Sequence, residues 1–385
     1  MENTVKLNKT KIGLIAILVA IILAIGLFGS GCVSGMAPIG WSGGTVANDI
    51  LYVGSNEGRL VALNLADDSR QWSDKLKVAA QTGLFGCSAS SFGCGTGTSN
   101  VVIYGTPVVS GDLVYIAGYN GKIYAYKTEN LNTQRWVYPR DSYLEPFVGG
   151  LVIAQGKLFI GCSDGKVYSF DAVTGDKIAE FKTGDKIWGT PTVDGDTLYI
   201  GSFDKKLYAL STDTLKLKWE YAAEGSIIST PLVNEGIVYF GSFDRNLYAV
   251  GAADGSLKWK FMAKSWFWAQ PQIVDGTVYA GCLDGFVYAL KAGTGEKIAD
   301  FNLGSAVSSQ PVIVNNYIVF ASSKGIIYKI DTGTRQITQL ADLKMNVDGP
   351  LAAYQGIIYI HPQGLILQRV NIDTGAVLPD ISLQS

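Results

Sequence analysis

The chain has 385 residues, of which 48% are hydrophobic and 17% charged, and it contains 46 glycines, 20 tyrosines and 8 tryptophans. This composition agrees with an all-β globular protein that has a large core. The formal net charge is −2, and no block of Lys or Arg occurs outside the N-terminus. Nucleic acid is therefore excluded as an expected partner, because phosphate binding needs a concentrated basic surface.

The first residues predict a targeting segment. A charge-free apolar run covers residues 12–28, and three lysines come shortly before it (Lys6, Lys9 and Lys11). The run is long for the apolar part of a signal peptide and just long enough to span a bilayer. We therefore expect residues 1–31 to be a signal or anchor segment. Its lysine-rich end stays in the cytoplasm, and residues 32–385 lie on the other side of the membrane.

The end of this segment, Gly29-Ser30-Gly31-Cys32, resembles a bacterial lipobox, in which small residues precede a cysteine that becomes lipid-modified after cleavage. Gly29 stands where such motifs usually have leucine. Two predictions stay open, namely a lipoprotein lipidated at Cys32 and an uncleaved transmembrane anchor. Both make the protein a membrane-anchored one, either periplasmic or on the cell surface.

Four further cysteines fall into two groups. Cys87 and Cys94 lie in an insertion rich in Gly, Ser and Thr, residues 74–103. A disulfide between them would restrain this loop, and the alternative is two free thiols. Cys162 and Cys282 occupy equivalent positions three repeats apart. A disulfide requires Cα atoms within about 7 Å, so we expect these two to be separate, buried and inert.

Over residues 149–340 the sequence repeats itself with a spacing of 40 residues. Tyrosines, prolines and glycines keep the same register (Tyr168, Tyr208, Tyr248, Tyr288 and Tyr328; Pro191, Pro231, Pro271 and Pro311; Gly161, Gly201, Gly241 and Gly281). A period near 40 with short apolar runs points to propeller blades. Within one repeat, four runs rich in Tyr, Val, Ile and Trp are separated by turn residues, as expected for four strands.

Eight such repeats can be counted, at residues 45–72, 105–138, 149–181, 190–221, 230–261, 270–301, 310–340 and 349–383. The predicted fold is an all-β, eight-bladed β-propeller of four-stranded antiparallel blades. A ring of blades leaves no long exposed sheet edge. The last two repeats are less regular, and the sequence does not indicate which strand closes the ring.

Catalytic and metal-binding patterns are weak. His361 is the only histidine, so a Ser-His-Asp triad or a zinc site is not expected. We expect His361 to replace the usual glycine at a strand end. Four aspartates recur at the repeat spacing (Asp164, Asp204, Asp244 and Asp284). Each stands alone in its turn, so we expect them to stabilise turns and not to bind metal.

The repeat motifs Pro-x-Val, Tyr-x-Gly-Ser, Asp-Gly-x-x-Tyr-Ala-Leu and a closing Lys-Trp resemble the pyrroloquinoline-quinone-type propeller repeat, over about residues 41–383. This family contains quinoprotein dehydrogenases. It also contains cofactor-free propellers such as BamB, a lipoprotein of the machine that assembles outer-membrane β-barrels. The repeat describes architecture and does not choose between these functions.

The resemblance implies two roles for tryptophan. Four tryptophans close repeats and would pack between adjacent blades (Trp72, Trp136, Trp219 and Trp259). Loss of Trp219 is expected to cost about 3–5 kcal/mol of stability. Trp188 and Trp268 precede innermost strands, which line one mouth of the channel in this family. Their register position is shared by Ile228, Ser308 and Asp348, and further candidates lie nearby (Lys186, Lys264, Trp266 and Phe267).

These residues at the mouth have two readings, since exposed tryptophans beside cations bind peptides or sugars, and large rings can also plug a wide channel. A family dehydrogenase would hold its quinone between a Trp and a vicinal Cys-Cys disulfide, with Ca²⁺ on carboxylate and amide oxygens. This chain has no adjacent cysteines. Asn346 and Asp348 could supply oxygen ligands for Ca²⁺, and Trp188 or Trp268 could supply the stacking ring. These residues come from different blades.

The function predicted from the sequence is a membrane-tethered scaffold outside the cytoplasm, without catalytic residues or cofactor. It would bind an envelope or membrane protein through the aromatic mouth or by strand addition at blade edges. The alternatives are a dehydrogenase that uses pyrroloquinoline quinone and Ca²⁺, and a receptor for a small ligand or carbohydrate.

Overall fold

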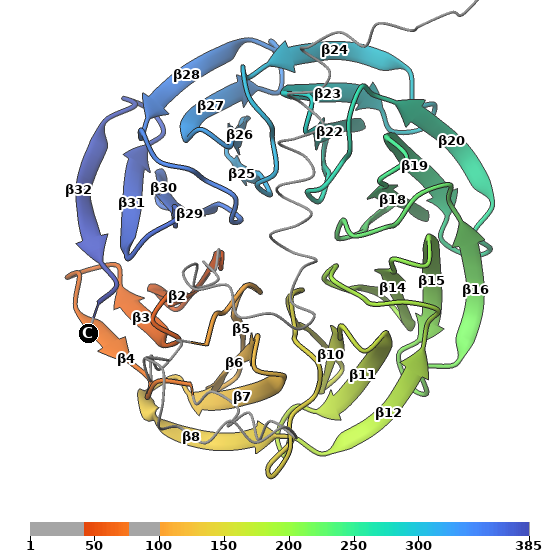
Figure 1. Cartoon of the computed structure of the whole chain (residues 1–385). Helices are drawn as coiled ribbons and strands as arrows, with labels where there is room; N and C mark the ends of the chain where they lie inside the picture. The colour runs from red at the N-terminus through yellow and green to blue at the C-terminus, as the bar shows by residue number, and fades with distance from the viewer. Residues whose placement is uncertain (1–41, 77–100, 385) are drawn as a thin grey trace, which may run out of the picture. The chain divides into compact units, whose positions relative to one another are not determined.

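The computed structural model describes residues 42–76 and 101–384, and all the regular elements in these ranges are β-strands. The strands form eight four-stranded antiparallel sheets, which stand around a central axis as the blades of a propeller (Figure 1). The predicted fold is confirmed. The predictions for residues 1–31, for Cys32, and for Cys87 and Cys94 lie outside the described residues. Within those residues, no helix long and apolar enough to cross a membrane is found.

Each blade takes four consecutive strands. Blades 1 to 4 consist of β1 Gly44–Ala47, β2 Ile50–Gly54, β3 Leu60–Asn64, β4 Arg70–Trp72; β5 Val108–Ser110, β6 Leu113–Gly118, β7 Lys122–Lys127, β8 Asn130–Tyr138; β9 Val152–Ala154, β10 Lys157–Gly161, β11 Lys166–Asp171, β12 Lys177–Lys182; β13 Thr192–Asp194, β14 Thr197–Gly201, β15 Lys206–Ser211 and β16 Leu217–Ala222. Blades 5 to 8 consist of β17 Leu232–Asn234, β18 Ile237–Gly241, β19 Asn246–Gly251, β20 Leu257–Met262; β21 Gln272–Val274, β22 Thr277–Gly281, β23 Phe286–Lys291, β24 Lys297–Asn302; β25 Val312–Val314, β26 Tyr317–Ala321, β27 Ile326–Asp331, β28 Ile337–Asp342; β29 Ala352–Tyr354, β30 Ile357–Ile360, β31 Ile366–Asn371 and β32 Val377–Ser382.

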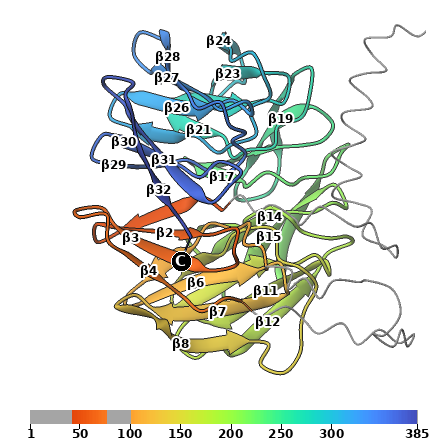
Figure 2. The same ribbon diagram turned by 60° about the vertical axis from the view of Figure 1, so that its left-hand side comes forward.

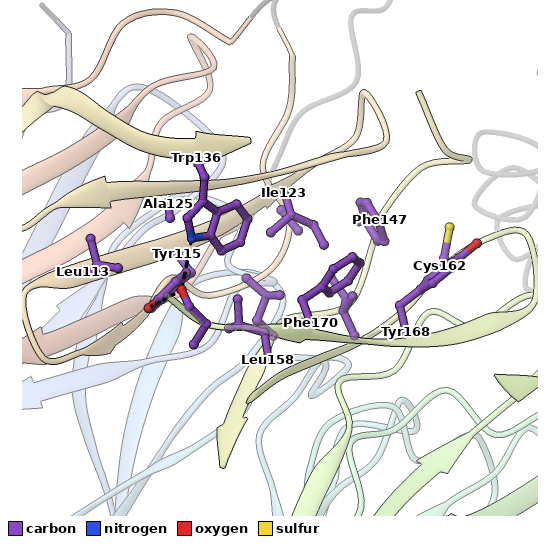
Figure 3. Packing of buried hydrophobic residues seen from close by; sticks show 14 residues of the cluster. Leu113, Tyr115, Ile123, Ala125, Trp136, Phe147, Leu158, Cys162, Tyr168 and Phe170 are labelled. Carbon is purple, nitrogen blue, oxygen red and sulfur yellow. Dashed lines mark hydrogen bonds between the residues drawn. The ribbon is translucent and has the colours of Figure 1, made fainter. Parts of the chain in front are cut away.

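The core lies between neighbouring blades. The second and third strands of a blade, such as β14 and β15, are almost wholly buried, whereas the fourth, such as β16, alternates between exposed and half-buried residues. This pattern follows from the stacking, because the middle strands are covered on both faces and the rim strand is not. In one cluster, Tyr115 of blade 2 packs with Phe170 of blade 3 (Figure 3). The apolar middle runs of each repeat therefore form the core.

The recurring aspartates hold turns, as predicted. One carboxylate oxygen accepts a backbone N–H two residues ahead, and the other accepts a tyrosine hydroxyl at 2.5 to 2.8 Å (Tyr168 to Asp164, Tyr208 to Asp204, Tyr248 to Asp244 and Tyr288 to Asp284). Asp204 also accepts the N–H of Gly184 from the connection that precedes its blade. Tyr328 has Lys324 in place of the aspartate, and its hydroxyl donates to a backbone carbonyl instead.

Three of the four closing tryptophans dock one blade on the next, as expected. Each indole N–H donates to a backbone carbonyl of the following blade at 2.8 to 3.0 Å (Trp136 to Ala172, Trp219 to Ala252 and Trp259 to Ala292). Each ring lies over a glycine with positive φ, where a Cβ would come within 2.5 to 2.7 Å of the ring (Gly175, Gly255 and Gly295). Figure 3 shows Trp136 in this position.

The prediction that Trp72 packs between blades is confirmed, but Trp72 contacts blade 8 and not blade 2, and its indole N–H donates to Leu383 O at 3.4 Å. In blades 3 to 6 a β-bulge places an extra residue in the fourth strand, and in blade 4 it leaves Trp219 opposite Ala209. The short β4 has no bulge, so Gln71 lies opposite the equivalent residue Ala62. A shift of one residue turns a side chain to the other face of a sheet. Trp72 accordingly packs on blade 8, and Gln71 lines a hollow of about 80 Å³ between blades 1 and 2.

The ring closes without strand exchange, because blades 1 and 8 are each made of consecutive strands. Figure 2 shows β32 beside β2 and β3. Side chains from both blades share one core cluster. Polar contacts also cross this junction: Arg70 Nη1 donates to Ser382 O at 2.7 Å, Arg369 pairs with Asp68 at 3.0 Å, and His361 Nδ1 lies 3.0 Å from Ser42 O. His361 directly follows β30, which confirms its prediction as a strand-end residue.

Candidate functional site at the mouth of the central channel

A hollow of about 120 Å³ lies on the propeller axis, since residues from blades 2 to 8 line it. In each of these blades one lining residue stands four positions before the innermost strand (Tyr104, Val148, Trp188, Ile228, Trp268, Ser308 and Asp348). The structure thus brings together the register position singled out from the sequence. It adds Tyr104 and Val148, which sequence analysis missed because the insertion offsets blade 2 and because valine is not conspicuous.

An unbroken row of five aromatic side chains extends from this mouth, and we call it the aromatic belt (Trp188, Phe203, Phe243, Trp266 and Trp268). Trp188 meets Phe203 edge-on with ring centroids 4.7 Å apart. Phe203 meets Phe243 at 6.2 Å. Phe243 then stacks on Trp266 at 4.3 Å and lies 5.9 Å from Trp268. All five rings are half-buried, so the belt offers aromatic surface to solvent.

Two kinds of segment build the belt. Trp188, Trp266 and Trp268 lie in connections between blades, and Phe203 and Phe243 lie in turns between second and third strands. Backbone hydrogen bonds join turn to connection, with the N–H of Phe203 donating to Lys186 O at 3.0 Å. Equivalent bonds run from Phe243 to Ser226 and from Leu283 to Trp266. Turns and connections are therefore held on one face, which makes the row continuous across blades.

The two lysines differ in their positions. Lys186 Nζ lies 4.6 Å from the centroid of the Trp188 ring and 4.6 Å from that of Phe203, so it places a positive charge at one end of the belt. Cation–π contacts of this kind hold a charge over a ring face. Lys264 Nζ lies instead over Phe286 of β23, at 5.8 Å.

Phe267 is not accessible. It is 1% exposed and packs in a core cluster with Tyr288, to which its ring centroid lies at 6.0 Å. Its neighbours Trp266 and Trp268 are half-exposed, so side chains alternate between core and surface along this connection. The register equivalents of Phe267, Ile187 and Ile227, are buried as well. We therefore remove Phe267 from the candidate site.

Asp348 lies on the mouth. Its carboxylate accepts the hydroxyl of Ser308 at 2.9 Å and the side-chain amide of Gln363 at 2.9 Å. Among the described lining residues of the axial hollow it is the single charged one. It lines the same hollow as Trp188 and Trp268.

The residues at the mouth do not fit a quinone site of the kind that the resemblance implies. The chain has no adjacent cysteines. Cys162 and Cys282 are buried free thiols in blades 3 and 6, and burial raises the pKa of Cys282 to about 12. The hollow is smaller than the about 300 Å³ at which pockets for drug-sized ligands begin. Within residues 42–76 and 101–384, no three His, Cys, Asp or Glu side chains are grouped as metal ligands would be.

Phe203 and Phe243 were missed in the sequence although they carry a signal. They stand 40 residues apart in turns where sister repeats have Ser163, Leu283 and Ser323. Their position in a turn does not indicate that they contact the tryptophans of the connections between blades. Only the hydrogen bonds between turn and connection bring the two groups together.

This chain is similar to a protein family and to solved structures. The family model described as outer membrane protein assembly factor BamB matches residues 34–178 and 163–379. The crystal structure of BamB from Moraxella catarrhalis is similar with a TM-score of 0.65 and 18% identity, over 88% of this chain and 96% of that chain. The computationally designed Ika8 protein has a TM-score of 0.68 and 15% identity, over 86% and 95%. No curated protein sequence matches the chain.

Proposed function

The chain belongs to the family of the outer membrane protein assembly factor BamB, and from this premise we propose that it is a membrane-tethered scaffold that binds an envelope protein through the aromatic belt. The observation that carries the proposal is the continuity of the belt. Five half-exposed rings from blades 4 to 6 form an unbroken set of ring contacts on one face. Large exposed aromatic surfaces mark interaction sites, and tryptophan is enriched at the residues that dominate binding energy.

The rim strands support the mouth as the binding surface. Strand addition needs an accessible, uncharged edge, and charged side chains oppose it. In β12, Lys177 and Glu180 pair at 2.7 Å. In β16, Lys218 pairs with Asp196 at 2.7 Å. Charges along the outer strands therefore favour docking at the belt over docking at the blade edges.

The location outside the cytoplasm rests on the sequence. The lysines before residues 12–28 and the lipobox-like end at Cys32 support a tether in the membrane. The proposed partner is a protein of the same compartment.

Replacing Trp266 and Trp268 together with alanine is expected to reduce partner recovery at least tenfold, because such residues contribute about 2 kcal/mol or more each at interfaces. The measurement is affinity purification of the full-length membrane-bound protein after crosslinking in its own cells, with partners quantified by mass spectrometry. A matched control removes two exposed apolar side chains of β20, the blade 5 strand that leads into this connection (Leu257 and Met262, 48% and 59% exposed).

The control variant should retain the partner, and both variants should keep the thermal midpoint of the wild type. Equal recovery with the tryptophan variant and the control would contradict binding through the belt. Loss in the control alone would move the interface to the rim of blade 5.

A further inference from the structure

The axial hollow carries a charge that the fold itself does not balance. Its described lining consists of aromatic, aliphatic, glycine, threonine and glutamine residues together with Asp348. Both groups that donate to this carboxylate, from Ser308 and Gln363, are neutral. No ion pair joins it to a cation among the described residues. A half-buried carboxylate is best stabilised by a cation that donates hydrogen bonds to it.

The Asp348 carboxylate can accept further hydrogen bonds. Its two oxygens offer about four acceptor positions, and the described contacts use two of them. The channel walls are largely uncharged, and a narrow mouth of this kind concentrates the field of a single charge. The mouth therefore attracts a positive group more strongly than an exposed aspartate would.

Two tryptophans, Trp188 and Trp268, also line the hollow. Trp188 already has Lys186 over its ring at 4.6 Å. Trp268 lines the hollow, and its one ring contact in the described residues is with Phe243. A cation near Trp268 would gain attraction to the ring face in addition to its contact with the carboxylate. Arginine suits both, since its planar guanidinium stacks on aromatic rings and donates two parallel hydrogen bonds to a carboxylate.

Size restricts the guest to one side chain. The hollow of about 120 Å³ is too small for a sugar or a cofactor of ordinary size. It has room for about four water molecules, since each occupies about 30 Å³ in the liquid. A guanidinium group can take their place.

We propose that the axial hollow binds an arginine side chain, with Asp348 accepting from the guanidinium and Trp268 stacking on it. The site deepens the proposed function, because the arginine would belong to the protein that the aromatic belt holds. Belt and hollow meet at Trp268, so one polypeptide segment with aromatic or aliphatic residues near an arginine would occupy both.

The test uses capped arginine, N-acetyl-arginine methylamide, as a probe on the purified full-length protein in detergent. Fluorotryptophan labelling gives one fluorine signal for each tryptophan, and Trp268→Phe assigns the relevant one. Capped arginine should shift the Trp268 signal saturably, with a Kd in about the millimolar range. Capped citrulline, which is neutral and of the same shape, should bind at least tenfold more weakly, as expected when a charge-assisted contact is lost.

Asp348→Asn should weaken capped arginine at least tenfold, whereas Asp373→Asn, an exposed turn residue of the same blade, should not. Equal affinity for arginine and citrulline, or unchanged arginine affinity in Asp348→Asn, would overturn the proposal. So would saturation of the Trp268 signal by Ca²⁺ with none by arginine. The citrulline comparison needs only the wild type, so it decides even if Asp348→Asn does not fold.

The outcome is separate from that of the proposed function. The probe assay needs no partner, and partner recovery in the belt variant needs no arginine. Arginine binding with unchanged partner recovery would keep this site and refute docking through the belt. The reverse result would keep the belt and refute the site.

Discussion

Replacing Trp259 with alanine is expected to lower the free energy of unfolding by about 3–5 kcal/mol. The side chain is 8% exposed and joins blade 5 to blade 6. Its indole N–H donates to Ala292 O at 2.8 Å, and its ring lies 5.7 Å from that of Tyr239. The ring also covers Gly295. Alanine would leave a cavity between two blades and would remove one of the two hydrogen bonds to Ala292 O, the other coming from the Tyr239 hydroxyl at 3.1 Å.

The measurement is denaturant unfolding of the purified protein monitored by circular dichroism. The thermal midpoint is measured as well. Gln71→Ala is a matched control, because Gln71 occupies the same register position in blade 1 and is exposed. It should change stability by no more than about 0.5 kcal/mol, as surface substitutions usually do. Trp259→Phe should fall between the two, since it keeps a ring and loses the hydrogen bond. A loss below about 1 kcal/mol in Trp259→Ala would show that docking does not join these blades.

The same comparison corrects the expected cost for Trp219. That residue is half-buried, whereas Trp136 and Trp259 are 7% and 8% exposed. Folding buries less apolar surface at Trp219. Its replacement by alanine should therefore cost less stability than the ~3–5 kcal/mol expected from the sequence. The sequence identifies a closing tryptophan and does not indicate how far the rim of its blade covers it.

Repetition made the fold predictable from sequence. Tyr208, Pro231 and Gly201 recur every 40 residues because each performs the same task in every blade. Gly201, for example, packs so closely that a Cβ would meet Ile227 at 2.2 Å. Where a blade departs from the common geometry, an equivalent residue contacts a different neighbouring blade. Trp72 lies nine residues after Leu63, as Trp219 lies nine after Leu210. The missing bulge in β4 turns the Trp72 side chain to the other face of its sheet.

The site was predictable in part. The register position of Trp188, Trp268 and Asp348 is a local property of the repeat, so sequence spacing located it. Phe203 and Phe243 join the belt through contacts with another segment, which spacing within one position does not reveal. Phe267 was misplaced for a related reason, because an apolar residue between two tryptophans gives no sign of which face it takes. Ring closure depends on pairing between residues more than 300 positions apart, as between Asn56 and Gly364.

His361 should make the stability of the protein depend on pH between 5 and 7. It is buried between Nδ1···O of Ser42 at 3.0 Å and Nε2···O of Gly364 at 3.3 Å. Burial lowers the pKa of His361 below its ordinary value of 6.5, and the two carbonyl contacts offset this only in part. The folded protein therefore holds the imidazole neutral at a pH where the unfolded chain binds a proton.

The sign follows from that difference in protons. As pH falls below 6.5, protonation favours the unfolded chain, and stability is lost by up to about 1.4 kcal/mol for each pH unit until the folded pKa is reached. The loss between pH 7 and pH 5 is at most about 2 kcal/mol, the limit for an imidazole that stays neutral in the folded protein. Where a carboxyl pKa shift is resolved in the described residues, the pKa is lowered, so its contribution is lost only at more acidic pH.

The measurement is the free energy of unfolding at several pH values from 5 to 7 at constant ionic strength. His361 is the only histidine in the chain, so the wild-type curve reports on it directly. His361→Gln keeps a hydrogen-bond donor at the junction of blades 1 and 8, and its curve should be flat over this range. Wild-type stability that rises on acidification would mean that the folded protein prefers the imidazolium, which can donate to both carbonyls at once. The junction between blades 1 and 8 would then be held by a charge.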